Sequence, residues 1–346
     1  MSAHSQPVPS AASKSQPSPQ LFFDTINAFQ RSAALKGAIE LDLFTAVAEG
    51  NKTADAIALR VQASQRGVRI LADYLTVIGF LTKSANQYDL TPDSAAFLNR
   101  HSPTYIGGAT AFLLYPEHVE RYNKIAESVR KGGTVFDDTI ATEESEMWVT
   151  FAEAMGKLQA MTSELLAKVL HVEGAQHLKV LDIAAGHGMF GIALARHNPH
   201  AEIVAVDWNN VLEVAKKNAE QAGVADNWRA LPGSAFDVDY GTNYDLVLIT
   251  NFIHHFDKNT AEKLLKKVHA GLAPNGRVAI LDFIPNEDRV SPPMQAMFPL
   301  TMLVGTESGD AYTRPEYQQM LKNSGFHREE LHELLPSFFR AMIARK

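Results

Sequence analysis

From Leu178 onward, short apolar runs alternate with amphipathic stretches of helical period. The runs are LKVLDIAA, AEIVAVDW, YDLVLITNF and GRVAILDFI, and the stretches between them include FGIALARHN, VLEVAKKNAEQAG and TAEKLLKKVHAGL. Strands that alternate with helices of this length form a parallel sheet with helices on both faces. Ligands of such sheets bind beyond the carboxyl ends of the strands, so the residues that follow each run are the first candidates for a site.

The chain before this region has a different pattern, and we divide it into three parts. Residues 1–20 combine Ser, Pro, Gln and Ala without an apolar segment, which predicts a disordered tail. Residues 21–103 predict amphipathic helices followed by a small hairpin, an order that indicates a winged-helix-like unit. Residues 104–175 predict further helices, which link this unit to the α/β domain of residues 176–346 and form part of a substrate wall.

Charge and composition narrow the expected partners and compartment. The net charge is -7, and residues 21–100 hold eight Lys and Arg against eight Asp and Glu. A neutral unit does not favour nucleic acid, so we expect it to form a homodimer instead. No stretch approaches the roughly 20 apolar residues of a membrane span. The chain has no cysteine, which excludes disulfides, thiolate metal sites and a cysteine nucleophile, and which agrees with a cytoplasmic protein.

The first two apolar runs end in residues suited to a nucleoside. The first ends in the turn DIAAGHG, residues 182–188, whose small side chains let the backbone approach a ligand closely. Its glycine spacing matches neither a dinucleotide fingerprint nor a P-loop, and it has no Lys or Arg, so a phosphate is disfavoured. The second run ends in Asp207, where a carboxylate accepts hydrogen bonds from ribose hydroxyls. Trp208 either lies against an adenine or covers the domain surface.

With these motifs on one chain, the sequence resembles class I methyltransferases, which bind S-adenosylmethionine. The match continues in order through VLDIAAGHG, VDWNNVLEVAKKNAEQAG, ITNFIHHFD and GLAPNGRVAILDF. Residues 21–346 are similar to the O-methyltransferases of small hydroxylated metabolites, such as plant phenolic, acetylserotonin and bacterial polyketide or carotenoid enzymes. The resemblance implies a doubly wound, Rossmann-like α/β domain. It also implies S-adenosyl-L-methionine as methyl donor, S-adenosyl-L-homocysteine as product, and a hydroxyl of a small aromatic or polyene-like metabolite as acceptor.

The resemblance also assigns the cofactor contacts. It places the methionine-binding turn at residues 182–188, the ribose carboxylate at Asp207, and the stretch that flanks the adenine at residues 233–236. Ala184 stands where many members have glycine, and Ser234 stands where many have an acidic residue. The predicted cofactor-binding residues are Asp182, Ala184, Gly186, Gly188, Asp207, Trp208, Ser234, Ala235, Phe236 and Asn251.

For catalysis the resemblance implies His254 as general base and Asp282, 28 positions later, as the carboxylate that orients it. Histidine titrates near neutral pH, and a carboxylate on its other nitrogen fixes the tautomer and supports the imidazolium. The family's further carboxylate falls on Ala311, next to Asp310, so we expect the pair without a third acid. Consecutive side chains of an extended segment point in opposite directions, so His254 and His255 should not share a metal ion, and we expect no metal.

Two segments supply candidate substrate contacts, with core packing as the alternative for each. One lies upstream of the glycine-containing turn, and the other, rich in flexible methionine, follows the last apolar run. Three other functions stay open: a C-methyltransferase, a cofactor-binding relative that performs decarboxylation, hydroxylation or a pericyclic step, and a winged-helix ligand-sensing regulator. The candidate substrate residues are Phe151, Met155, Met294, Met297, Phe298 and Met302.

Overall fold

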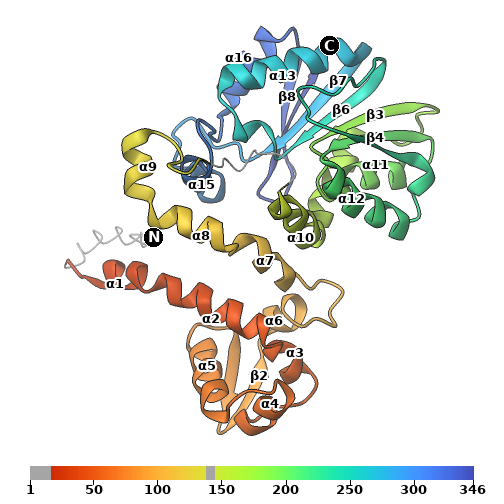
Figure 1. Ribbon diagram of the computed structural model, residues 1–346. Coiled ribbons are helices and arrows are strands. Elements are labelled where there is room, and N and C mark those ends of the chain that lie inside the picture. The colour runs from red at the N-terminus through yellow and green to blue at the C-terminus, as the bar shows by residue number, and fades with distance from the viewer. Residues whose placement is uncertain (1–16, 138–144) are drawn as a thin grey trace, which may run out of the picture. The chain divides into compact units, whose positions relative to one another are not determined.

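The computed structural model describes residues 17–137 and 145–346 (Figure 1). The described residues form two compact units, which are divided between Tyr105 and Ile106. Most of the predicted disordered tail lies outside the described residues, and helix α1 already begins at Gln20. None of the described helices is long and apolar enough to cross a membrane.

The first unit consists of helices followed by a two-stranded antiparallel hairpin and one more helix. Apolar side chains of its second to fifth helices and of the hairpin form its core. Phe22, Ile26 and Phe29, on the first two helices, are 64%, 57% and 68% exposed and contribute nothing to that core. Its elements are α1 (Gln20–Ile26), α2 (Ala28–Glu40), α3 (Leu43–Ala48), α4 (Ala54–Arg60), α5 (Gln65–Val77), β1 (Leu81–Ser84), β2 (Gln87–Leu90) and α6 (Pro92–Phe97).

The second unit begins with helices and continues into a sheet of seven strands in the order β5-β4-β3-β6-β7-β9-β8. Its first helices are η1 (Gly107–Ala109), α7 (Thr110–Leu113), α8 (Pro116–Asn123), α9 (Ile125–Lys131) and α10 (Glu146–Leu170). The strands are β3 (Leu178–Ile183), β4 (Ala201–Asp207), β5 (Trp228–Pro232), β6 (Tyr244–Thr250), β7 (Leu272–Asp282), β8 (His327–Glu333) and β9 (Arg340–Arg345). The later helices are α11 (Met189–His197), α12 (Asn209–Gln221), η2 (Ala225–Asn227), η3 (Ile253–His255), α13 (Lys258–Gly271), α14 (Pro293–Met297), α15 (Pro299–Gly305) and α16 (Arg314–Asn323).

Strands β3 to β7 pair in parallel, as the alternating pattern predicts, and β9 joins β7 antiparallel with β8 at the edge. The sequence does not reveal β8, because HREELHE is a polar edge strand without an apolar run. It also does not reveal β5, because WRALP is short and mostly solvent-facing. The doubly wound class is therefore confirmed, with an antiparallel edge that periodicity alone does not predict.

Each inner strand is buried on both faces, which explains its nearly continuous apolar run. On one face, Val180 and Leu246 pack with α10, α11 and α12, and on the other, Leu181 and Val247 pack with α13 and α16 (Figure 1). The chain winds outward from β3 in both directions, so the switch point lies between β3 and β6. The carboxyl ends of β3, β4, β6 and β7 meet at the edge where such sheets bind ligands.

Candidate active site

The end of β3 and the turn that follows it, residues 182–188, are built for close approach of the backbone to a ligand, and we call this segment the glycine turn. Ala184, Gly186 and Gly188 all have positive φ, at 52°, 54° and 74°. A side chain would not fit well at the glycines, because a Cβ on Gly188 would lie 3.0 Å from the Cβ of Ala215. The left-handed backbone at position 184 also explains why glycine suits it, since alanine adopts this conformation at some cost.

Asp182 is the penultimate residue of β3 and faces inward rather than toward an open ligand site. It is fully buried, and its Oδ2 accepts a hydrogen bond from the backbone N–H of Gly191 in α11 at 3.2 Å. Its Oδ1 is enclosed without a hydrogen-bond partner among the described residues. Burial raises the pKa of Asp182 to about 7, because the charged form is poorly solvated there. The carboxyl group therefore connects the strand to the helix on the other side of the glycine turn.

Asp207 connects the end of β4 to the same turn. Its Oδ2 accepts from the N–H of Gly186 at 2.8 Å, and its Oδ1 accepts from the N–H of Trp208 at 2.7 Å. Burial raises the pKa of this carboxyl to about 6, although the two N–H donors oppose the shift. Each carboxylate oxygen has more than one lone pair, so both can still accept a hydrogen bond from a ribose hydroxyl.

The predicted adenine flank contributes packing and backbone groups. Phe236 lies edge-on to Phe256, with ring centroids 5.0 Å apart, and its N–H donates to the Oγ of Ser234 at 3.1 Å. Ala235 is buried. Trp208 packs beside an apolar cluster that includes Ala152 of α10, so it covers α10 and α12 in this structure. Whether it also touches an adenine stays a prediction.

Asn251 follows β6 directly and has a left-handed backbone with φ 53°. Its N–H donates to the carbonyl of Leu281 in β7 at 2.8 Å. Its side-chain Oδ1 is enclosed without a partner among the described residues, an arrangement that costs about 1–3 kcal/mol unless a ligand or water supplies a donor. The residue is therefore a candidate ligand contact at the end of the strand next to β3.

His254 and Asp282 form a buried hydrogen-bonded pair. The Nδ1 of His254 lies 2.5 Å from the Oδ1 of Asp282, and the two residues are 3% and 0% exposed. Asp282 also accepts from the N–H of Phe283 and from the hydroxyl of Tyr317, each at 2.8 Å. The carboxylate oxygens only accept, so Nδ1 carries the proton and Nε2 presents its lone pair. We call His254, Asp282 and Tyr317 the histidine corner.

The sequence did not suggest Tyr317, which lies in α16, 35 positions after Asp282. It donates to Oδ2, the oxygen that His254 does not use, and it is fully buried. Burial and the neighbouring carboxylate raise the pKa of Tyr317 well above its usual value, so the hydroxyl remains a donor. Ala311, at the position of the family's further carboxylate, is buried and offers no polar side chain. The carboxylate of Asp310 lies 3.4 Å from the guanidinium of Arg289 instead.

One premise of the sequence interpretation was wrong. Strand β6 ends at Thr250, and His254 and His255 lie on the 3₁₀ turn η3 rather than on an extended segment. Their rings therefore do not point in opposite directions but lie side by side, with centroids 4.4 Å apart and planes at 57°. The part of the chain that the structure describes contains no group of three or more His, Cys, Asp or Glu that could hold a metal ion.

Aromatic side chains of α10 cover the glycine turn. Phe151 is stacked beside His187, and a Cβ on Gly186 would lie 3.2 Å from the Phe151 ring. Burial lowers the pKa of His187 to about 4, so the turn carries a neutral imidazole. Trp148, one helical turn earlier, lies edge-on to both Phe151 and His255, at 5.8 and 5.7 Å. The same helix thus extends from the glycine turn to His255, which lies beside the histidine corner.

The other predicted substrate residues divide into three groups. Phe298 lies edge-on to His254 at 4.8 Å and stacks on Phe283 at 3.7 Å, so it lies against the histidine corner. Met155 and Met302 are buried, which is consistent with either a pocket floor or the core. Met294 and Met297 form the third group, and their side chains are 49% and 61% exposed. The structure does not show these two side chains lining an enclosed pocket, and their contact with a substrate stays a prediction.

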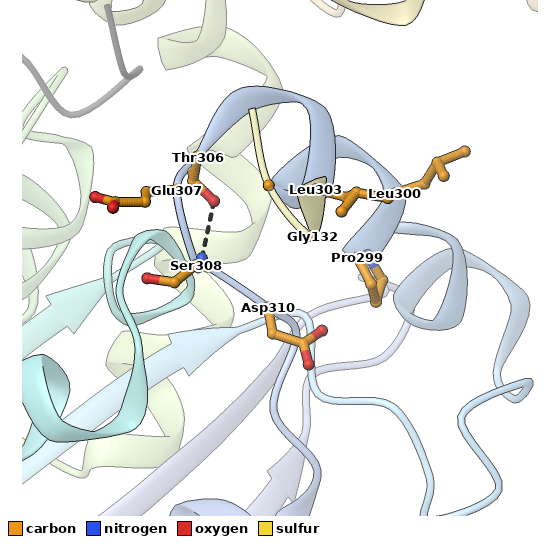
Figure 2. A pocket seen from close by; sticks show the side chains of 10 residues that line it. Gly132, Pro299, Leu300, Leu303, Thr306, Glu307, Ser308 and Asp310 are labelled. Carbon is orange, nitrogen blue, oxygen red and sulfur yellow. Dashed lines mark hydrogen bonds between the residues drawn. The ribbon is translucent and has the colours of Figure 1, made fainter. Parts of the chain in front are cut away.

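A pocket of about 460 Å³ lies behind the histidine corner. Figure 2 shows apolar side chains of α15 and polar side chains of the loop that follows it around this hollow. The loop touches the backbone of the histidine corner, because the N–H of Asp310 donates to the carbonyl of His254 at 3.0 Å. A side chain on Gly309 would collide with the same carbonyl. The lining residues are Gly132, Gly133, Pro299, Leu300, Leu303, Thr306, Glu307, Ser308, Gly309 and Asp310.

Comparison with known proteins decides the family. The model of the O-methyltransferase domain matches residues 122–327, more than half of the chain, and the model of the O-methyltransferase dimerisation domain matches residues 23–100. The chain belongs to the O-methyltransferase family.

Three relatives illustrate this membership. A solved structure from Nostoc punctiforme, described as a candidate O-methyltransferase, is 49% identical, covers 96% of this chain and 100% of its own, and superimposes with a TM-score of 0.92. The 3-hydroxy-5-methyl-1-naphthoate 3-O-methyltransferase of Streptomyces sahachiroi is 27% identical over 316 residues, 89% of each chain. Human N-acetylserotonin methyltransferase, solved in complex with S-adenosylmethionine, is 23% identical, covers 97% of this chain and 99% of its own, and shares the fold with a TM-score of 0.83.

Proposed function

We propose that this O-methyltransferase transfers the methyl group of S-adenosylmethionine to a hydroxyl of a small aromatic acceptor, with His254 as general base. One observation carries the proposal: a hydrogen-bonded His254–Asp282 pair lies at the same sheet edge as the glycine turn. The carboxyl ends of β3, β6 and β7 are neighbours, so a ligand on the glycine turn has its reactive end near the base.

The residues at the switch point fit the proposed methyl donor. The glycine turn offers positive-φ backbone without a phosphate-binding cation, and Asp207 offers a carboxylate at the end of β4. The enclosed Oδ1 of Asn251 has no donor among the described residues, and a polar ligand on this edge would supply one. S-adenosylmethionine combines a ribose diol with an amino-acid end and has no phosphate, so it suits this set better than a dinucleotide.

The chain's own residues then act on the acceptor. When bound, the donor supplies an activated methyl group that leaves from a sulfonium. The Nε2 of His254 accepts the acceptor's hydroxyl proton while that oxygen forms its bond to the methyl carbon, and the C–S electron pair stays on sulfur. Asp282 stabilises the resulting imidazolium through Nδ1, and Tyr317 and the N–H of Phe283 hold the carboxylate in place. The imidazolium finally returns its proton to water.

The aromatic surroundings of the base support a flat acceptor. Phe298 and Phe283 stack at 3.7 Å beside His254, and Trp148 lies on the far side of His255. Aromatic side chains bind flat rings through stacked or edge-on contacts. The naphthoate methylated by the Streptomyces sahachiroi relative is an acceptor of this kind, so fused-ring phenols are the first class to assay.

The function can be tested directly with labelled donor. Purified protein is incubated with methyl-labelled S-adenosylmethionine and a panel of phenols and naphthols without added metal, and products are scored by mass gain and site of methylation. We expect transfer to oxygen and release of S-adenosylhomocysteine. Methylation on carbon would favour the C-methyltransferase alternative. A protein that binds S-adenosylhomocysteine but methylates no member of the panel would contradict the proposed acceptor class.

We also propose a homodimer formed through residues 21–100. The match to the dimerisation domain and the exposed apolar side chains of Phe22, Ile26 and Phe29 support this state. Light scattering should give twice the mass of one chain, and Phe29→Asp should reduce it. A full-length chain that is monomeric at micromolar concentration would exclude the homodimer. The cytoplasm and the lack of a nucleic-acid partner stay our expectations, based on the absence of cysteine and the neutral charge of this unit.

A further inference from the structure

His255 is a second imidazole beside the base that the proposed mechanism leaves without a role. Its ring lies 4.4 Å from the ring of His254, and three aromatic residues surround it edge-on: Trp148 at 5.7 Å, Phe252 at 6.3 Å and Phe256 at 6.2 Å. A polar ring held in an aromatic surrounding needs a hydrogen-bond partner. No described residue provides one.

The two nitrogens of His255 differ in their surroundings. Nδ1 is enclosed and has no hydrogen-bond partner among the described residues, whereas Nε2 is not an enclosed atom. Burial and the adjacent His254 lower the pKa of His255 well below its usual value, so the ring is neutral and holds one proton. Unpartnered enclosed N–H groups are rarer than unpartnered acceptors. The proton therefore belongs on Nε2, which then offers an N–H donor.

The neighbouring base offers the complementary group. Because Nδ1 of His254 donates to Asp282, its Nε2 presents a lone pair, and this nitrogen is not an enclosed atom either. One lone pair and one N–H donor thus come from adjacent rings on η3. An acceptor molecule matches both groups if the hydroxyl to be methylated has a second oxygen as its neighbour.

We infer that His255 selects acceptors in which the reacting hydroxyl is adjacent to another oxygen, as in vicinal diphenols and ortho-hydroxy carbonyl compounds. The inference rests on the proposed function and adds a substrate class to it. The reacting hydroxyl donates to Nε2 of His254, and the adjacent oxygen accepts from Nε2–H of His255. His255 is thus a positioning residue, since it holds the acceptor in register without taking the proton.

The test uses two isomers of equal composition, 2,3-dihydroxynaphthalene with adjacent hydroxyls and 2,7-dihydroxynaphthalene with separated ones. We expect the full-length protein to have a kcat/KM for the 2,3 isomer at least about tenfold above that for the 2,7 isomer, since a site built for two hydrogen bonds rejects a ligand that makes one. His255→Phe keeps a flat ring but removes the donor, so the ratio should fall to within about threefold, mainly through KM. His255→Gln returns an N–H donor and should restore part of the ratio.

The outcomes separate this inference from the proposed function. Equal kcat/KM for both isomers in the unaltered protein would overturn the selection and leave O-methylation intact. A ratio that is unchanged in His255→Phe would overturn the role of His255 alone. Methylation of neither isomer would count against the proposed acceptor class itself. Calorimetry with S-adenosylhomocysteine checks that each variant is folded, and a variant that does not bind it is replaced by His255→Leu in the same comparison.

Discussion

The glycine turn and the histidine corner lie at one edge of the same sheet but are built in different ways. The glycine turn is one contiguous segment with a positive-φ backbone, and its buried Asp182 leaves one carboxyl oxygen without a partner among the described residues. Asp207, at the end of β4, accepts the N–H of Gly186 in this turn, and burial raises the pKa of both carboxyl groups. The histidine corner takes side chains from η3, β7 and α16, and its carboxylate already accepts three hydrogen bonds. The glycine turn therefore still has polar atoms that a ligand can bind, whereas the hydrogen bonds of the histidine corner are formed without a ligand.

The largest effect is expected from a substitution that disrupts the histidine corner and leaves the glycine turn intact. His254→Ala should reduce turnover by about 10²- to 10⁴-fold, the usual effect of losing a positioned base. Cofactor affinity should stay near that of the unaltered protein, because His254 does not touch the glycine turn in this account. Steady-state kinetics and calorimetry with S-adenosylhomocysteine measure the two quantities. A more acidic phenol should recover part of the lost rate, since it needs less help to lose its proton.

The reverse change breaks the glycine turn and leaves the histidine corner intact. Gly186→Ala places a Cβ 3.2 Å from the ring of Phe151 on a residue with φ 54°, so the affinity for S-adenosylhomocysteine should fall at least about tenfold, or ~1.4 kcal/mol. Gly223→Ala is the matched control, because Gly223 also has a positive φ of 71° but its Cβ would meet nothing within 4 Å. Equal affinities for both variants would show that close approach at Gly186 is unimportant.

A smaller effect is expected for Tyr317, the third member of the histidine corner, and it tests the role of that residue. Tyr317→Phe removes the hydrogen bond to Oδ2 of Asp282, which should lower kcat by about 3- to 10-fold, the kinetic equivalent of about one net hydrogen bond. The acid limb of the pH–rate profile should shift as well, because the freed carboxylate interacts differently with the imidazolium. Stopped assays from pH 5 to 9 measure both effects. A profile unchanged in shape, with only reduced thermal stability, would reduce Tyr317 to a structural residue.

The smallest expected effect is a pH dependence of cofactor binding. Asp207 has a pKa raised to about 6 in the free protein, so part of it is protonated below that pH. Ribose hydroxyls donate to the ionised carboxylate, and bound ligand therefore favours loss of that proton. The affinity for S-adenosylhomocysteine should fall by about twofold between pH 7 and pH 6, with protons released on binding. Calorimetry in buffers of different ionisation enthalpy measures the release, and Asp207→Asn should show neither effect.

The same contrast explains what the sequence could predict. The glycine turn and Asp207 follow two recognisable apolar runs, so spacing along the chain was enough to place them at one sheet edge. The pairing of His254 with Asp282 followed from a family resemblance and is present in the structure as a hydrogen bond. The catalytic role of that pair stays a prediction.

Other features depend on tertiary contacts that no local pattern encodes. Tyr317 reaches Asp282 only because α16 packs on the same face of the sheet as α13. His255 lies beside His254 because a 3₁₀ turn replaces the expected end of the strand. The contact of Phe151 with the glycine turn likewise depends on where α10 packs.

The most direct measurement is a crystal structure of the protein with S-adenosylhomocysteine and the acceptor found by the labelled screen. We expect the sulfur to lie between the glycine turn and the histidine corner. The acceptor oxygen should be within about 2.6–3.2 Å of Nε2 of His254, the reach of a general base. An acceptor oxygen that faces the sulfur but lies out of reach of His254, directly or through one water, would contradict the account, because the two regions would then not act on the same pair of atoms.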